Sequence, residues 1–122
     1  MPTALAVALG GGAGSLARYW IVLAFKRLDL AFPLGTLFVN VAGSFLIGAA
    51  WGWCLGRPET PEWVRLGLMT GVLGGYTTLS AVSLETVLLA ESGSWGLAAA
   101  NAAANVGLGL AACFIGLALL RP

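Results

Sequence analysis

Polar side chains recur at helical spacing inside otherwise apolar segments of this chain. Thr36, Asn40 and Ser44 follow one another four residues apart, and Asn101 and Asn105 repeat that interval near the C-terminus. Residues four apart lie on one face of a helix. Amide and hydroxyl groups inside a membrane span bond to a neighbouring helix or face a polar cavity. The spacing therefore predicts either interhelical hydrogen bonds or the lining of an ion path, and leaves both interpretations open.

Residues 71–85, "GVLGGYTTLSAVSLE", combine glycines with hydroxyl side chains in the middle of a hydrophobic segment. Gly74 and Gly75 have poor helix propensity, and the hydroxyls of Thr77 and Thr78 offer the backbone alternative hydrogen bonds. We therefore expect the helix to break there at mid-span. A break at membrane depth frees carbonyl oxygens, which is tolerable only where they are buried in protein, line water or coordinate an ion.

Beyond the expected break, Thr77, Ser80 and Ser83 recur every three residues and form a track of hydroxyl donors, with Glu85 about one turn further on. Arg18 is a cation within the first apolar segment. Its guanidinium could reach the nearer membrane surface along its own stem, or could draw anions into a vestibule. Donor-lined walls near an arginine favour a small anion over a cation as the permeating species.

The composition is that of an integral membrane protein. Of the 122 residues, 59% are hydrophobic and 9% are charged, whereas about a quarter of a soluble domain is charged. The net charge of +1 gives no basic face for a nucleic-acid partner. There is no histidine and no nucleophile–base pair, so we expect no enzyme, and Cys54 and Cys113 are interpreted as isolated thiols in the membrane.

Hydropathy predicts an all-α membrane protein with one four-helix domain, residues 1–122. A span needs about 20 apolar residues. The four candidate helices are approximately 3–25, 33–55, 63–90 and 95–120. The first is expected to be a membrane helix rather than a cleaved signal peptide, because it lacks a basic leader region. Glycine ladders at 48, 52 and 56 and at 67, 71 and 75 predict close helix packing, within the chain or against a second copy.

The basic residues give almost no orientation signal. One membrane side would carry Arg57, Arg65 and Arg121, and the other Lys26 and Arg27, with Arg18 slightly inside that end. Because orientation follows the excess of Lys and Arg in cytoplasmic loops, this balance predicts insertion in both directions. Two opposite copies could then pair as an antiparallel, dual-topology dimer.

Three motifs in register resemble the CrcB/Fluc family of fluoride channels. They are "GGGAGSLARYW", "FPLGTLFVNVAGSFLIG" and "GGYTTLSAVSLE", and "NAAAN" extends the resemblance into the fourth helix. The resemblance implies a plasma-membrane channel of prokaryotic type, an antiparallel dimer whose two pores export fluoride and reduce its toxicity. It also implies a structural, untransported sodium ion at the dimer centre, held by the backbone carbonyls of Gly74 and Thr77.

The same resemblance assigns roles to individual residues. Arg18 would be the vestibule arginine and Asn40 the pore asparagine. The other pore positions would be Thr78, Leu79, Ser80, Val82 and Ser83. Family members usually read "TTFSTFS", with two phenylalanine ring edges that face fluoride, whereas this chain reads "TTLSAVS" and has Leu79 and Val82 instead.

Two other functions remain open at the level of the sequence. The first is a non-conducting partner subunit that binds sodium while a homologous subunit supplies the aromatic rings. The second is a small dual-topology drug–proton antiporter, which the chain resembles less because such proteins have an essential carboxylate in the first helix, where this chain has Arg18. The sequence leaves open whether Glu85, Asn101 and Asn105 line the pore or are structural.

Overall fold

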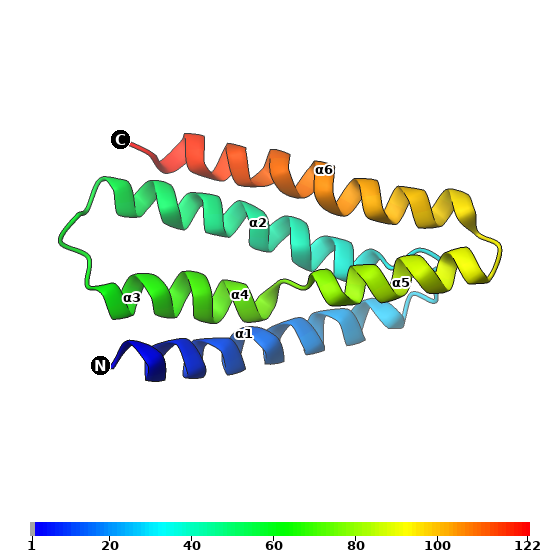
Figure 1. Ribbon diagram of the computed structural model, residues 1–122, viewed down its shortest axis with the longest axis horizontal. Coiled ribbons are helices and arrows are strands. Elements are labelled where there is room, and N and C mark those ends of the chain that lie inside the picture. Colours follow the sequence, from blue (N-terminus) through cyan, green and yellow to red (C-terminus); the bar gives the residue numbers. More distant parts are fainter. Residues whose placement is uncertain (1) are drawn as a thin grey trace.

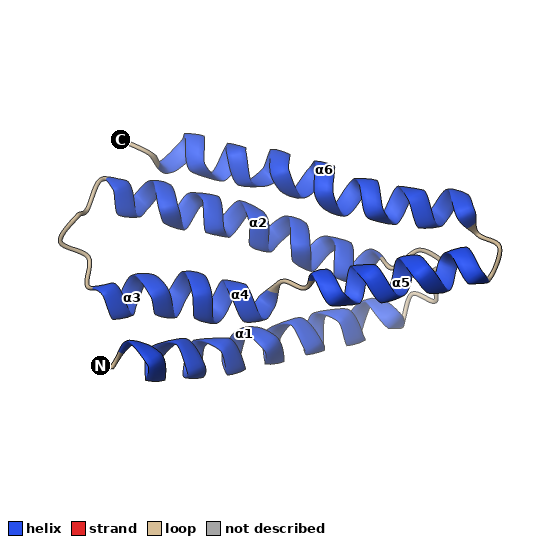
Figure 2. Ribbon diagram, viewed as in Figure 1, coloured by secondary structure: helices blue, strands red, loops and turns tan. Residues whose placement is uncertain are grey.

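The computed structural model describes residues 2–122 as four helical spans, each antiparallel to the next along the chain (Figure 1). The uninterrupted spans are α1 (Thr3–Lys26), α2 (Leu34–Leu55) and α6 (Trp95–Leu120). The third span consists of α3 (Glu62–Leu66), the π-helical segment η1 (Gly67–Leu73), α4 (Gly74–Tyr76) and, after a break, α5 (Leu79–Glu91). The described residues contain no strand (Figure 2). The all-α class and the mid-span break are thus confirmed.

Short connections keep the spans antiparallel. The turn from α5 to α6 is closed by the Ser94 N–H, which donates to the Leu89 carbonyl at 2.8 Å, and by the Gly93 N–H, which donates to the Ala90 carbonyl at 3.0 Å. Gly93 has a φ of +85°, a conformation that glycine adopts without penalty. This Schellman-type cap lets α6 fold back at once along α5.

The first glycine ladder packs within the chain, where α2 and α6 run together along most of their length. A Cβ on Gly52 would come within 2.9 Å of the Leu117 carbonyl, and the Gly48 backbone lies directly against Cys113. In the same way, Gly116 of α6 lies directly against the backbone of Phe45 in α2. These glycines of α2 therefore allow close backbone contact with α6 inside the subunit, and not with a second copy.

The second glycine ladder joins α1 to the first half of the third span. Gly67 lies against Ala6, and Gly71 lies against Val7. Within this stretch the backbone widens into the π-helix η1, which the sequence pattern did not predict. Short π-helical turns occur inside α-helices and often at functional sites.

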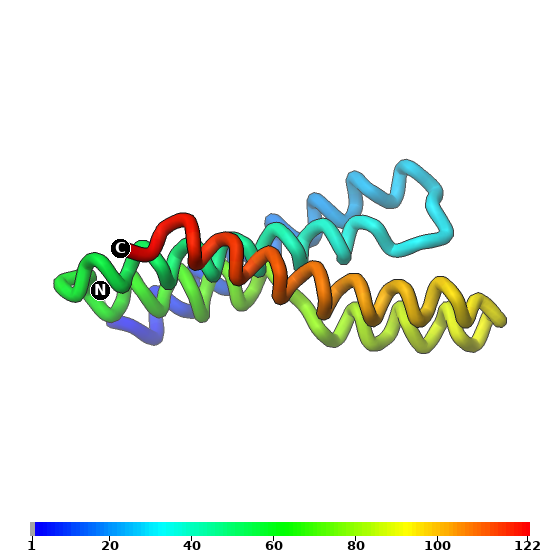
Figure 3. The backbone as a smooth tube through the Cα atoms, turned by 90° about the horizontal axis from the view of Figure 1, so that it is seen from above, coloured from blue at the N-terminus to red at the C-terminus, as the bar shows by residue number. Residues whose placement is uncertain are grey.

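The two halves of the third span have different neighbours. The segments before the break pack on α1, whereas α5 packs mainly on α6. Figure 3 shows the result: the connection between α1 and α2 lies on one side, and the α5–α6 pair diverges to the other. Cavities that are mainly apolar but carry several polar side chains lie between these pairs and at the break.

Candidate ion site at the break in the third span

The break consists of two extended residues between α4 and α5. Thr77 has φ −88° and ψ 157°, and Thr78 has φ −152° and ψ 117°. Thr78 is also the N-cap of α5, because its Oγ1 accepts a hydrogen bond from the Ala81 N–H at 3.2 Å. The hydroxyls that the sequence pattern singled out thus end one helix and begin the next.

Asn40 of α2 holds the break from the opposite side. Its Oδ1 accepts from the Thr78 N–H at 2.8 Å, and its Nδ2 donates to the Thr78 carbonyl at 3.1 Å. The same Nδ2 donates to Asn105 Oδ1 of α6 at 2.9 Å. Asn40 is only 9% exposed. One buried amide therefore satisfies the peptide groups of a residue that has left the helical ladder, as buried backbone requires.

The carbonyls of residues 74–77 all lose their helical donors at the break, and those of Gly74 and Thr77 illustrate how. In an unbroken helix the Thr78 N–H would donate to the Gly74 carbonyl, but it donates to Asn40 instead. The Ala81 N–H would likewise donate to the Thr77 carbonyl, but it donates to the Thr78 hydroxyl. Gly74 is also exposed, and a Cβ added there would meet only the Met69 carbonyl at 3.6 Å. The carbonyls of Gly74 and Thr77 are thus available to another partner.

A third carbonyl at the break is satisfied from α1. The Gly75 carbonyl accepts from Ser15 Oγ at 3.3 Å and from Arg18 Nε at 3.2 Å. Gly75 lies against the backbone of Gly11, and this contact brings α1 within reach. Arg18 is therefore held at the break rather than extended along α1 to the membrane surface, and sequence reasoning missed this partner.

A cavity of about 250 Å³ opens at the break. Its polar lining comes from Asn40, Ser44, Thr77, Thr78 and Asn105, and Leu79 and Val82 contribute apolar walls. The two positions that stand in place of the family's phenylalanines differ strongly: Leu79 is 75% exposed, whereas Val82 is 5% exposed. Val82 is part of the interior of the subunit, and Leu79 projects from it.

The expected hydroxyl track is only partly present. The Thr77 hydroxyl belongs to the preceding turn, since it donates to the Leu73 carbonyl at 3.0 Å. Ser80 and Ser83 are exposed on α5; the Ser80 hydroxyl lies 3.1 Å from that of Thr78, and the Ser83 hydroxyl donates to the Leu79 carbonyl at 3.0 Å. The interpretation of Thr77 as the first member of a track along α5 is therefore wrong, because the break separates it from that helix.

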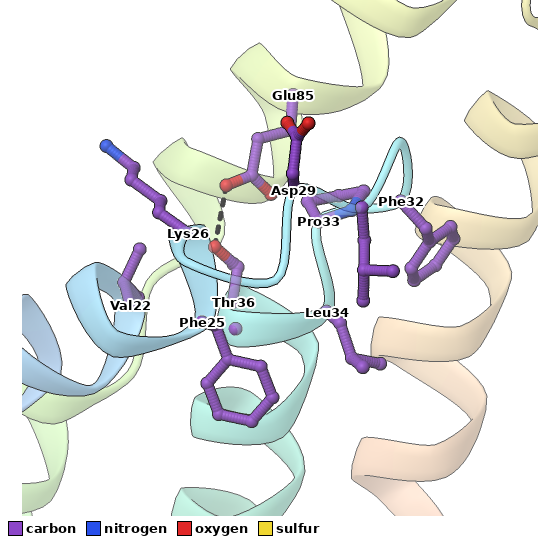
Figure 4. Close-up of a pocket in the computed structure, with 11 residues that line it drawn as sticks. Val22, Phe25, Lys26, Asp29, Phe32, Pro33, Leu34, Thr36 and Glu85 are labelled. Atoms are coloured by element: carbon purple, nitrogen blue, oxygen red, sulfur yellow. Dashed lines mark hydrogen bonds between the residues drawn. The ribbon is translucent and has the colours of Figure 1, made fainter.

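A second polar region lies between the break and the α1–α2 connection. Thr36 Oγ1 donates to Glu85 Oε1 at 2.6 Å, as Figure 4 shows among the residues around one cavity of about 240 Å³. A neighbouring cavity of about 330 Å³ is lined by Arg18, Lys26, Thr36 and Glu85. Within residues 2–122, the buried Glu85 Oε2 has no hydrogen-bond partner. A basic cavity thus leads to the carboxylate from the side of Arg18.

The two asparagines of α6 are not free for an approaching helix. Asn101 is fully buried, and its Nδ2 donates to Thr86 Oγ1 of α5 at 3.0 Å. Asn105 reaches both Asn101 and Asn40. Sequence reasoning placed these side chains on one face but gave no signal for the helices that they meet.

Comparison with known proteins identifies the family. The sequence profile described as "CrcB-like protein, Camphor Resistance (CrcB)" matches residues 5–117. The chain belongs to the CrcB-like family. It is 47% identical over 120 residues to the "Fluoride-specific ion channel FluC" of Rhodopseudomonas palustris (strain BisB5), a match that covers 98% of this chain and 97% of the relative.

Two further relatives with the same name are equally similar. The one from Granulibacter bethesdensis is 48% identical over 122 residues, covering 99% of this chain and 96% of the relative. The one from Rhizobium meliloti (strain 1021) is 48% identical over 118 residues, covering 96% and 94%. Residues 2–122 contain four helices long and apolar enough to cross a bilayer. Together with these bacterial relatives, they make the chain a multi-pass protein of the cell membrane, in a family of ion channels rather than enzymes.

Proposed function

We propose that this chain is a fluoride-specific ion channel that exports fluoride across the cell membrane and thereby reduces its toxicity. The observation that carries the proposal is the similarity, over nearly the whole chain, to relatives named as fluoride-specific ion channels. Two cavities support it, because their otherwise apolar walls carry hydroxyl and amide groups inside a membrane-embedded helix bundle.

The proposed route runs from the basic cavity to the cavity at the break. Arg18 and Lys26 raise the local concentration of anions at the entrance, as a cationic vestibule does. Asn40 and Thr78 then replace hydration water with polar groups at the break, and Ser80 and Ser83 continue the proposed path along the exposed face of α5, where the Ser83 hydroxyl must first release the Leu79 carbonyl. Since the N–H groups of Asn40 are already engaged, an anion must displace one of their present acceptors to bind there.

The proposed assembly is an antiparallel dimer with a structural sodium ion at its centre. The exposed position of Gly74 and the two carbonyls freed by the break support this arrangement. One copy offers two such carbonyls, at Gly74 and Thr77, and an opposed second copy would offer two more. Backbone carbonyls at a broken helix suit a hard cation. When bound, sodium would hold the two breaks together by charge, without being transported.

The second candidate is a non-conducting partner subunit in a heterodimeric channel. One observation favours it: Leu79 and Val82 give the break cavity aliphatic walls where the family has aromatic rings. Such a subunit would supply the fold and the sodium ligands, while its homologue supplies a conducting pore. A third candidate, the drug–proton antiporter, gains no support from the relatives, which are named as ion channels.

Growth of bacteria tests the proposed function. A strain that lacks its own fluoride exporter should regain growth in millimolar fluoride when it expresses this chain alone. The matched control is Asn40→Asp at equal membrane abundance, which should give no rescue. If the chain alone fails to rescue but does so together with a phenylalanine-containing homologue, the partner-subunit function is correct. If it fails in both cases, neither function stands.

A further inference from the structure

A cavity of about 190 Å³ lies where α2 connects to α3, at the end of the bundle that also carries the C-terminus (Figure 1). One wall is the C-terminal end of α2, with Trp51, Cys54 and Leu55. The other wall holds both Arg57 and Arg65. No carboxylate among residues 2–122 lines the cavity. It is therefore apolar on one side and cationic on the other.

The two arginines have N–H donors that the protein does not use. Arg57 lies over the ring of Trp53, with Cζ 4.5 Å from the ring centroid, and makes one long hydrogen bond, from Nη1 to the Trp53 carbonyl at 3.5 Å. Arg65 is half-buried, yet its guanidinium has no hydrogen-bond partner within residues 2–122. A guanidinium offers five N–H donors in a fixed fork. Most of these donors are thus available to an acceptor from outside the chain.

The tryptophans around the cavity place it at the membrane–water interface. Trp51 is 42% exposed, and Trp53 and Trp63 are each 38% exposed. Exposed tryptophans are enriched at the level of the lipid headgroups. Because α2 ends at Leu55, the apolar wall belongs to the membrane-embedded end of the helix, whereas Arg57 lies beyond it.

We propose that this cavity binds the phosphate group of an anionic glycerophospholipid, whose acyl chains lie along the exposed side of Trp51 and Leu55. Arginine forks match phosphate oxygens in bidentate geometry. The cavity has room for a phosphate group, since a water molecule takes up roughly 30 Å³ in the liquid and the cavity holds about 190 Å³. The inference is independent of the proposed function, because neither arginine lines the cavities of the proposed fluoride route.

The charge of the lining selects among lipids. Glu59 and Glu62 lie nearby in the sequence, but neither lines the cavity. With two guanidiniums and no counter-charge in its wall, the cavity favours a headgroup of net negative charge. The ammonium group of a zwitterionic headgroup would be repelled by the same arginines.

Binding of lipid to the folded, delipidated protein in detergent tests the inference. Phosphatidylglycerol and phosphatidylcholine with identical acyl chains are compared by native mass spectrometry. We expect phosphatidylglycerol to bind more tightly, with one tight site per chain. Arg65→Gln should weaken its binding by about tenfold or more, the factor that a hydrogen bond to a charged group represents. Equal affinity of the wild-type protein for the two lipids overturns the inference.

Arg121→Gln is the matched control, because Arg121 lies at the same end of the bundle but does not line the cavity. It loses the same charge and should keep the wild-type affinity for phosphatidylglycerol. An equal fall in Arg121→Gln would mean that the lipid responds only to the charge of this membrane surface, and would overturn the inference. Arg65→Lys keeps the charge but loses the fork, so its affinity should lie between those of the wild type and Arg65→Gln. If Arg65→Gln does not fold, Arg65→Lys and Arg57→Gln carry the test, and unchanged affinity in both overturns the inference.

Inorganic phosphate distinguishes a lipid site from a site for free phosphate. At millimolar concentration it should not displace phosphatidylglycerol, because it has no acyl chains to contact Trp51 and Leu55. Displacement that disappears in Arg65→Gln would identify a free-phosphate site and overturn the lipid inference. None of these measurements depends on fluoride flux, so the inference and the proposed function can each fail without the other.

Discussion

Leu79 is the position where one substitution should change the rate of fluoride flux most cleanly. Its side chain is 75% exposed and borders the break cavity, so a phenylalanine there would meet little steric resistance within the subunit. A leucine offers an anion no electropositive edge, whereas the rim of an aromatic ring does. We therefore expect Leu79→Phe to accelerate fluoride flux through a protein that conducts slowly without it.

The magnitude is worked by giving one anion–edge contact the energy of an edge-to-face aromatic pair, about 0.5–1.5 kcal/mol. If the contact forms at the barrier, this lowers the activation free energy enough to raise the rate about 2- to 13-fold. Restoring both rings, with Val82→Phe as well, would give up to about 3 kcal/mol, or roughly 150-fold. However, Val82 is 5% exposed, and overpacking an interior position costs about 1–3 kcal/mol of stability. The single variant is therefore the cleaner test.

The assay is fluoride efflux from liposomes at equal protein density, with the size of the assembly checked in detergent. Val82→Phe alone is the informative companion: it should destabilise the assembly more than Leu79→Phe does. A Leu79→Phe protein that assembles normally and conducts no faster would show that the missing aromatic ring does not limit permeation. If the unmodified chain already conducts fluoride as fast as a relative with both phenylalanines, other hydrogen-bond donors are sufficient for permeation.

Three further predictions follow from the break and the charge distribution. Asn40→Asp should nearly abolish fluoride flux without unfolding the assembly, because it replaces the donor to Thr78 by an acceptor; unchanged flux would leave Asn40 a packing role only. Thermal stability of the assembly should be higher in sodium than in potassium or a large organic cation, because the carbonyls of Gly74 and Thr77 are the proposed ligands; equal stability in all three would remove the sodium site. A single cysteine at Glu59, in a background without native cysteines, should be labelled from both sides of the membrane, and labelling from one side in all molecules would disprove dual topology.

The fold could be predicted from the sequence because the patterns that determine it lie within single segments of the chain. The spans follow from the length of each apolar segment, and the break follows from the adjacent glycines Gly74 and Gly75 and the hydroxyls of Thr77 and Thr78. No local pattern indicated the π-helical segment Gly67–Leu73, which packs against α1.

The residue types of the candidate site could be predicted from the sequence, but the hydrogen bonds between them could not. Helical spacing placed Asn40 on one stripe and Asn105 on another, yet it gave no information on which stripe faces which helix. The bond between these residues joins positions 65 apart in sequence. The same holds for Arg18, whose partner is a backbone carbonyl that the break directs toward α1. Such contacts depend on the packing of whole helices.

Fluoride efflux from liposomes containing only the purified protein tests most directly whether this chain alone carries fluoride. A fluoride electrode outside potassium fluoride-loaded liposomes, with a potassium ionophore to carry the counter-ion, should register release faster than from protein-free liposomes. The same liposomes loaded with chloride should show much slower chloride release. Fluoride release no faster than from protein-free liposomes, by a protein shown to be folded and assembled, would contradict the account.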